Sequence, residues 1–141
     1  MIELRDYWMQ RDKDYSKSLT VEIEHEAERT VSLANKLLET ATLCGVTLPT
    51  HPVNGTHVSS GWRPPLINAA TPNAAPNSKH MTGQAIDIYD PDGDLDDWLM
   101  SEKGQATLDS IGLWMEHPSS TKSWSHLQSI PPNSGRRCFY P

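Results

Sequence analysis

Several features are scarce in this sequence of 141 residues, and each scarcity argues against a class of protein. Two cysteines, Cys44 and Cys138, are too few for a disulfide framework and lack the short spacing of a redox pair or a cysteine-rich zinc site. We expect both to be free thiols with packing roles. Lysine and arginine are scattered and the formal net charge is -6, so the sequence does not predict a nucleic-acid-binding surface.

Long apolar runs are also absent. No segment approaches the roughly 20 consecutive apolar residues of a membrane span, and we expect no membrane insertion. Residues 1–12 are rich in charge and lack the apolar stretch of a signal peptide. The sequence therefore predicts a protein that is made in the cytoplasm without an export signal.

The length fits one compact domain with a substantial core. We expect residues 1–19, which are polar with interspersed aromatic residues, to form an N-terminal arm, and residues 20–141 to form a single domain. Thr20 is a suitable N-cap for a long helix that Gly45 ends. Apolar residues recur along this helix at three- and four-residue steps and predict one core-facing stripe of Ile23, Ala27, Val31, Ala34, Leu38 and Ala41.

Beyond Gly45 the pattern changes to short strands and turns. Residues 95–111 predict a helix that is broken near Gly104, and residues 68–77 predict a surface loop. The strand pattern recurs in residues 58–63, 84–89, 113–117, 124–128 and 137–140. This order of elements predicts an α+β fold, in which a small, mainly antiparallel sheet has helices packed on one face.

A carboxylate and two histidines are the strongest candidates for a functional site. Because side chains alternate between the faces of a strand, Asp87 points to one face while Ile86 and Ile88 point to the core. If residues 84–89 and 124–128 are neighbouring strands, Asp87 and His126 face each other across the sheet. His80, in the loop before the first strand, would complete the group.

Two imidazoles and one carboxylate suit zinc, and three protein ligands leave a coordination position for water or substrate. Asp87 lies between two isoleucines, where an unpaired carboxylate would be costly to bury. The plainer interpretation is a surface histidine and a capping aspartate. The local pattern alone leaves both interpretations open.

The pattern Ser-x-His-x-x-Gly-x-Ala-x-Asp at 78–87, followed by Trp-x-His at 124–126, resembles the zinc D-alanyl-D-alanine metallopeptidase family. That family includes DD-carboxypeptidases, vancomycin-resistance dipeptidases and phage endolysins that cleave the L-alanyl-D-glutamate bond, and the hedgehog signalling domain shares its fold. The resemblance covers roughly residues 58–128. It implies a hedgehog-like or DD-peptidase-like fold, with Zn²⁺ held by His80, Asp87 and His126.

The resemblance also implies roles for neighbouring residues. Residues 60–63, Ser-Gly-Trp-Arg, are similar to a family stretch whose arginine binds substrate or stabilises the oxyanion, so Arg63 is expected to act in catalysis. Ser78 is expected to orient an imidazole or carboxylate ligand. Trp124 and Gln128 share the strand face of the last ligand, and we expect them to contact the substrate or a ligand.

One position departs from the family pattern. Many members carry the general base as a glutamate three residues before the last ligand or as a histidine two residues before it, and here these positions are Ser123 and Trp124. Glu116 is the preferred replacement, because antiparallel pairing of residues 113–117 with residues 124–128 would carry it close to the metal. His117 ranks second, since it points to the opposite face of a regular strand.

These features predict a zinc-dependent peptidoglycan peptidase, expected to be a monomer, that hydrolyses a peptide bond next to a D-amino acid of the stem peptide. Without an export signal, such an enzyme would act on the wall after lysis or after delivery inside a particle, as a phage lysin or virion-associated enzyme does. Three alternatives stay open: a non-catalytic metal-binding structural or wall-binding module of a phage particle, a structural zinc site with a fourth protein ligand, and a cytosolic dipeptidase acting on D-Ala-D-Ala.

Overall fold

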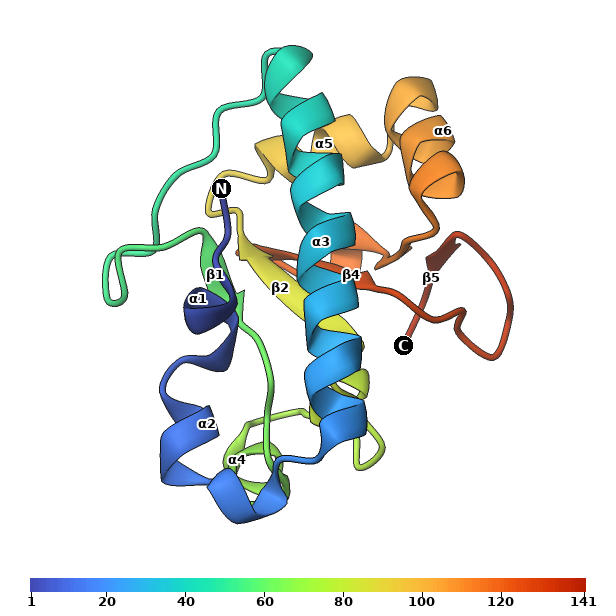
Figure 1. The fold of residues 1–141 in the computed structure, drawn as a ribbon. Helices are drawn as coiled ribbons and strands as arrows, with labels where there is room; N and C mark the ends of the chain where they lie inside the picture. The colour runs from blue at the N-terminus through green and yellow to red at the C-terminus, as the bar shows by residue number, and fades with distance from the viewer.

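An open five-stranded sheet lies at the centre of the molecule, with helices packed against it (Figure 1). The computed structural model describes residues 1–141. The strand order is β1-β2-β4-β3-β5, and every neighbouring pair is antiparallel except β3 and β5. The strands are β1 (Val58–Ser60), β2 (Ala85–Tyr89), β3 (Trp114–Glu116), β4 (Trp124–Gln128) and β5 (Cys138–Phe139). The predicted α+β fold class is confirmed.

The longest helix begins and ends close to where the sequence predicts, whereas the shorter helices match their predictions only in part. The predicted long helix is confirmed as α3, and its N-cap Thr20 accepts a hydrogen bond from the backbone of Ile23. In Figure 1 this helix crosses the sheet over β2. The α-helices are α1 (Leu4–Trp8), α2 (Arg11–Asp14), α3 (Val21–Leu43), α4 (Pro65–Ala70), α5 (Asp94–Leu99) and α6 (Glu102–Ile111).

The predicted break in the 95–111 helical segment is confirmed, but it lies at Met100 and Ser101 and not at Gly104. Ser101 is the N-cap of α6 and accepts a hydrogen bond from the backbone of Gly104. A Cβ atom at position 104 would collide with the backbone of Trp98 and Leu99. The glycine therefore permits close packing of α6 against α5 and does not interrupt the helix.

Strand β1 is shorter than the predicted 58–63 segment, because residues after Ser60 turn toward the N-terminal helices. The backbone N–H of Trp62 donates to the carbonyl of Tyr7, and Trp8 packs edge-on against the Trp62 ring with centroids 5.8 Å apart. Tyr7 and Trp62 are fully buried. Residues of the 1–19 segment thus belong to the same hydrophobic core as the sheet.

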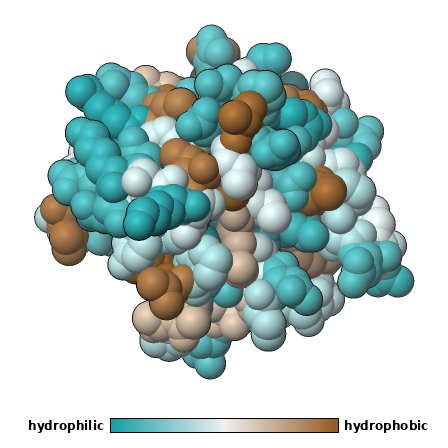
Figure 2. Space-filling view, turned by 60° about the horizontal axis from the view of Figure 1, so that its bottom comes forward, coloured by the Kyte–Doolittle hydropathy of each residue, from teal (hydrophilic) through white to brown (hydrophobic).

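Exposed apolar side chains are scattered over the surface. Figure 2 shows them on one face as separate patches among polar residues, so that face has no continuous apolar area. None of the helices combines the length and the apolar content that crossing a bilayer requires.

The buried carboxylate of Asp96 lies on the helix side of β4. Asp96 in α5 is 3% exposed; its Oδ2 accepts a hydrogen bond from Thr121, and its Oδ1 has no partner. Burial raises the pKa of Asp96 to about 6, and the nearby hydroxyls of Ser125, which donates to Asp90, and of Thr121 oppose this shift only in part. The charges of Asp90 and Asp97 add to it. Ionised Asp96 therefore costs folding free energy at neutral pH.

We expect Asp96→Asn to stabilise the protein at neutral pH but not in acid. The folded-state pKa lies above the ordinary 3.8, so the linked stability is fully present below that pH and is lost as the pH rises through about 6. The neutral amide avoids this loss, and after allowance for solvent screening we expect a gain of roughly 1 kcal/mol, or about 3 °C in Tm, near pH ~7.5. Thermal unfolding at about pH 7.5 and about pH 4 measures the difference.

Asp92→Asn is the control, because Asp92 is exposed in the turn before α5 and is not among the charges that shift the pKa of Asp96. Loss of an exposed charge is expected to change Tm little at either pH. An equal gain for Asp96→Asn at both pH values would contradict the assignment of Asp96 as a buried, destabilising charge.

Candidate metal centre

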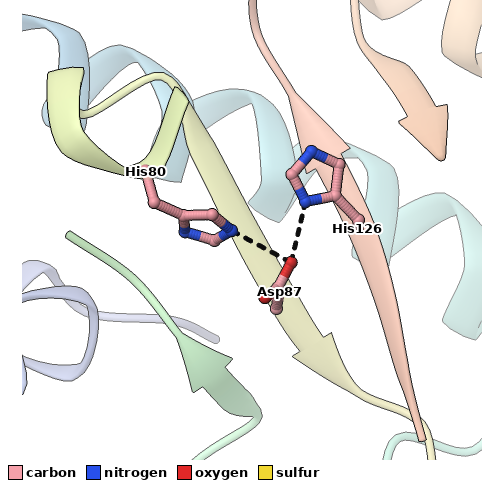
Figure 3. A group of neighbouring side chains, drawn as sticks. All are labelled: His80, Asp87 and His126. Atoms are coloured by element: carbon pink, nitrogen blue, oxygen red, sulfur yellow. Dashed lines mark hydrogen bonds and ion pairs between the residues drawn. The ribbon is translucent and has the colours of Figure 1, made fainter. Parts of the chain in front are cut away.

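Strands β2 and β4 and a short 3-10 helix just before β2 meet on the sheet face opposite α3 (Figure 3). Asp87 lies in β2 and is directly paired with His126 of β4 in the sheet register, so the predicted meeting across the strands is confirmed. His80 enters from a short 3-10 helix, Lys79–Thr82, that precedes β2. The adjacent residues Ile86 and Leu127 point the other way and are fully buried in the core.

The donor atoms of these side chains lie within 4.8 Å of one another. The Oδ1 atom of Asp87 is 3.2 Å from Nε2 of His80 and 2.9 Å from Nδ1 of His126. All three residues are buried. They form a buried group that could hold a metal ion.

The outward nitrogen of each imidazole faces a hydrogen-bond acceptor. Nδ1 of His80 is 2.8 Å from the carbonyl oxygen of Gly61, and Nε2 of His126 is 3.0 Å from Oε1 of Gln128. Because these oxygens only accept, each outward nitrogen carries the hydrogen. A neutral imidazole has a single N–H, and therefore the inward nitrogen of each neutral ring presents a lone pair to Asp87.

Two lone pairs and a carboxylate oxygen consequently point at one centre. Without a cation this arrangement is repulsive, unless the rings take up protons. Burial lowers the pKa of His80, and the attraction of Asp87 offsets this only in part, so its ring resists protonation. A metal ion at the centre would satisfy all three donors together. The side chains thus fit a bound metal.

The charge state of the other two residues also suits metal binding. Burial alone would raise the pKa of Asp87, but the imidazoles of His80 and His126 outweigh it and hold that pKa well below its usual range. Asp87 is therefore an anionic ligand at neutral pH. Burial lowers the pKa of His126, yet Asp87, Gln128 and Glu116 outweigh burial and raise it. A proton and a metal ion therefore compete for Nδ1 of His126.

The spacing of the donor atoms agrees with a tetrahedral site. Ligand distances of about 2.0–2.1 Å around zinc separate neighbouring donors by about 3.3 Å. The observed separations from the shared Oδ1 of Asp87 are 2.9 and 3.2 Å. Other divalent ions of the first transition row bind the same donor types, so the identity of zinc belongs to the proposal below.

Glu116 ends β3 beside this group. Strand β3 is antiparallel to β4, and Oε2 of Glu116 lies 4.0 Å from Nδ1 of His126. The side chain is 18% exposed. Burial raises the pKa of Glu116, while His126 lowers it and Asp87 raises it further. The structure thus brings the predicted general base to the edge of the candidate metal centre.

Arg63 lies on the His80 side of the group. Its backbone N–H donates to the carbonyl of His80 at 3.1 Å, and its Nη2 donates to Ser78 at 2.9 Å. Its Nε is buried without a hydrogen-bond partner. Burial lowers the pKa of Arg63 and the charge of Asp87 opposes that shift, but a guanidinium stays charged in proteins. Arg63 therefore offers a positive charge and an unused donor near the site.

Ser78 takes a different place from the one predicted. Its Oγ accepts hydrogen bonds from Nη2 of Arg63 and from the backbone N–H of His80. It makes no hydrogen bond with an imidazole ring or with the Asp87 carboxylate, and as N-cap of the 3-10 helix its hydroxyl accepts from the backbone. Ser78 fixes the segment that carries His80 and links it to Arg63.

The remaining predicted residues lie outside the immediate group. Trp124 pairs with Tyr89 in the sheet, and no hydrogen bond joins its side chain to the three ligands. His117 contacts the hydroxyl of Ser119 at 2.8 Å and stacks on the ring of Tyr140. His117 is thus engaged away from the centre, which leaves Glu116 as the nearer candidate base.

The two cysteines are free, as predicted, and neither belongs to the His80, Asp87 and His126 group. Cys138 is half-buried in β5 and packs against the core, but Cys44 is exposed at the end of α3, so the packing role expected of Cys44 is wrong. A structural zinc site completed by cysteine therefore has no support in this geometry.

Two contacts at the site carried no signal in the sequence. The carbonyl of Gly61 engages His80, and a side chain at Gly61 would collide with the backbone of Tyr7. Phe139 lies edge-on to His126 with ring centroids 6.1 Å apart, because β5 aligns it with Glu116. Both contacts join segments far apart in the chain, so local patterns could not reveal them.

No protein-family model, curated protein or solved structure matches the chain. Inference about function therefore rests on the site and on the motif within it.

We expect zinc to raise the thermal stability of the protein and a chelator to reverse this effect. A ligand that binds only the folded state at a thousand times its Kd adds about 4 kcal/mol. His80→Ala removes one of the three donors, so both the stabilisation and the bound zinc are expected to be lost. Differential scanning calorimetry and metal analysis of the purified protein measure the two effects.

His25→Ala is the matched control, because His25 is exposed on α3 and lies outside the group. It is expected to bind zinc like the unaltered protein. Equal zinc content in the unaltered protein and in His80→Ala would show that this group does not hold the metal.

Proposed function

We propose that the chain is a zinc-dependent peptidase that hydrolyses a peptide bond next to a D-amino acid in peptidoglycan. The convergence of three metal-ligand atoms beside the carboxylate of Glu116, 4.0 Å from His126, carries this proposal. The likeness of residues 78–87 and 124–126 to the zinc D-alanyl-D-alanine metallopeptidase motif supports the choice of substrate. Delivery to the wall by lysis or inside a phage particle stays a prediction from that resemblance.

A zinc ion held by His80, Asp87 and His126 would polarise the scissile carbonyl and make a water molecule at the open position more acidic. Glu116 removes a proton from the attacking water and then returns it to the leaving amine. Burial raises the pKa of Glu116, and this suits both steps, because a less acidic carboxyl group accepts the proton more readily.

Arg63 is the proposed partner for negative charge on the substrate. Its buried Nε has no protein partner, and its Nη2 is anchored by Ser78, so the guanidinium is held in place with donor capacity to spare. A planar guanidinium suits a carboxylate of the stem peptide or the oxyanion that forms during hydrolysis. Arg63 lies on the His80 side and Glu116 on the His126 side, and the scissile carbonyl would lie between them.

A non-catalytic metal-binding module of a phage particle is the second candidate function. The absence of a base at Ser123 and Trp124 favours it, because the family pattern places the proton-transferring residue there. Such a module would bind zinc and the wall without cleaving it. A binder would sediment with purified wall but release no new amino groups, whereas the peptidase would release them.

We expect Glu116→Gln to lower peptidase activity on purified peptidoglycan by about 10²–10⁴-fold, because the amide cannot take the proton from water. Zinc content is expected to be unchanged, since Glu116 is not one of the three ligands. New amino groups, measured with an amine-reactive reagent, report activity, and mass spectrometry of the released peptides identifies the bond.

Glu39→Gln is the control for loss of a negative charge, because Glu39 is exposed on α3 at the opposite side of the sheet. It is expected to keep full activity. If Glu116→Gln were also fully active, another group would be the base; if the unaltered protein released nothing, the non-catalytic module would be the better description.

A further inference from the structure

We propose that Gln128 is a positioning residue that holds His126 in the one tautomer able to bind the metal through Nδ1. The inference rests on the metal centre of the proposed function, but it does not depend on peptidase activity. It is carried by a chain of hydrogen bonds that runs from the backbone of Ile130 through Gln128 to the ring of His126.

The first link fixes the orientation of the Gln128 amide. Its Nε2 lies 2.9 Å from the carbonyl oxygen of Ile130. Since that oxygen only accepts, the NH₂ group of the amide must face Ile130 and Oε1 must face His126. Gln128 is 4% exposed, so its side chain has little freedom to turn away.

The second link fixes the ring. Oε1 of Gln128 lies 3.0 Å from Nε2 of His126 and can only accept, so Nε2 carries the hydrogen. The lone pair of the neutral ring is then on Nδ1, which lies 2.9 Å from Oδ1 of Asp87 and faces the centre. Without the acceptor, nothing at the outward side of the ring would favour this tautomer over the other one.

The position of Gln128 makes this contact rigid. It lies two residues after His126 in β4, so both side chains project from the same face of the strand. Its own position is paired with Ala85 of β2 on one side and with Trp114 of β3 on the other. A side chain anchored in the middle of the sheet can hold the imidazole with little motion.

The two histidines differ in how they are held. His80 is oriented by a main-chain carbonyl, that of Gly61, which no side-chain substitution removes directly. His126 depends on the side chain of Gln128. The tautomer of His126 is therefore the part of the metal centre that a single substitution can change without removal of a ligand.

The test compares zinc affinity among variants at position 128. Gln128→Met has nearly the same length but no acceptor, and we expect zinc affinity to fall about 10–100-fold. Gln128→Glu keeps an acceptor for Nε2 of His126 but loses the NH₂ group that donates to Ile130, so affinity is expected to fall less than in Gln128→Met. Competition for zinc with a chromophoric chelator measures each affinity.

Gln105→Met is the matched control. Gln105 is also partly buried and donates to a backbone carbonyl, that of Leu99, but it lies outside the metal group. It is expected to bind zinc like the unaltered protein. Equal affinity for zinc in Gln128→Met and the unaltered protein would overturn the inference.

Nitrogen-15 NMR of the zinc-loaded, unaltered protein provides a measurement that needs no variant. We expect the zinc-bound nitrogen of His126 to be Nδ1 and the proton to be on Nε2; zinc on Nε2 would overturn the inference even if Gln128→Met failed to fold. Absence of zinc binding would overturn both the metal centre and this inference. The expected order of affinities in a protein that cleaves no wall would support the inference and overturn only the proposed function.

Discussion

The shared contact of two imidazole nitrogens with one carboxylate oxygen governs the architecture of this site. Oδ1 of Asp87 lies within 3.2 Å of both inward nitrogens, while each outward nitrogen faces an oxygen acceptor. Neutral rings held in this way direct lone pairs at an anion, which is unfavourable unless a cation lies between them. A metal ion at the centre would remove this repulsion, as would a proton on Nδ1 of His126, whose pKa Asp87 raises. Metal affinity would then be coupled to stability through the same atoms.

Support for this arrangement comes from parts of the chain that do not touch the metal ligands. Tyr7 of α1 donates its hydroxyl hydrogen to the carbonyl of Ala85 at 3.0 Å, and its backbone lies against Gly61. Close approach at Gly61 requires the absence of a side chain there, and it places the carbonyl that orients His80. The N-terminal helices thus brace both β2 and the segment after β1. A substitution that destabilised α1 would therefore disturb the positions of β2 and of the carbonyl that orients His80.

The proposed base, Glu116, lies on a different strand from the three candidate metal ligands. The ligand-bearing segments supply metal donors, while the proposed base comes from the neighbouring strand β3, and Phe139 of β5 flanks it. A base on a separate strand is positioned by sheet pairing and not by the loop that precedes the last ligand. This makes the lack of a base at Ser123 compatible with catalysis. The same separation lets metal binding and proton transfer be altered independently.

Features that depend on neighbours along the chain could be predicted from the sequence. Strand alternation placed Asp87 and His126 on one face, and capping by Thr20 with a periodic apolar stripe defined α3. The pairing predicted for residues 113–117 even carried Glu116 toward His126.

Tertiary structure alone decided which atoms meet across long separations in sequence. Gly61 and Gly104 could be recognised as packing positions only from the helices against them. Nothing local indicates that Phe139 would lie beside His126. The tautomers are a tertiary property for the same reason: a ring nitrogen keeps or loses its hydrogen according to the acceptor that the folded chain places beside it.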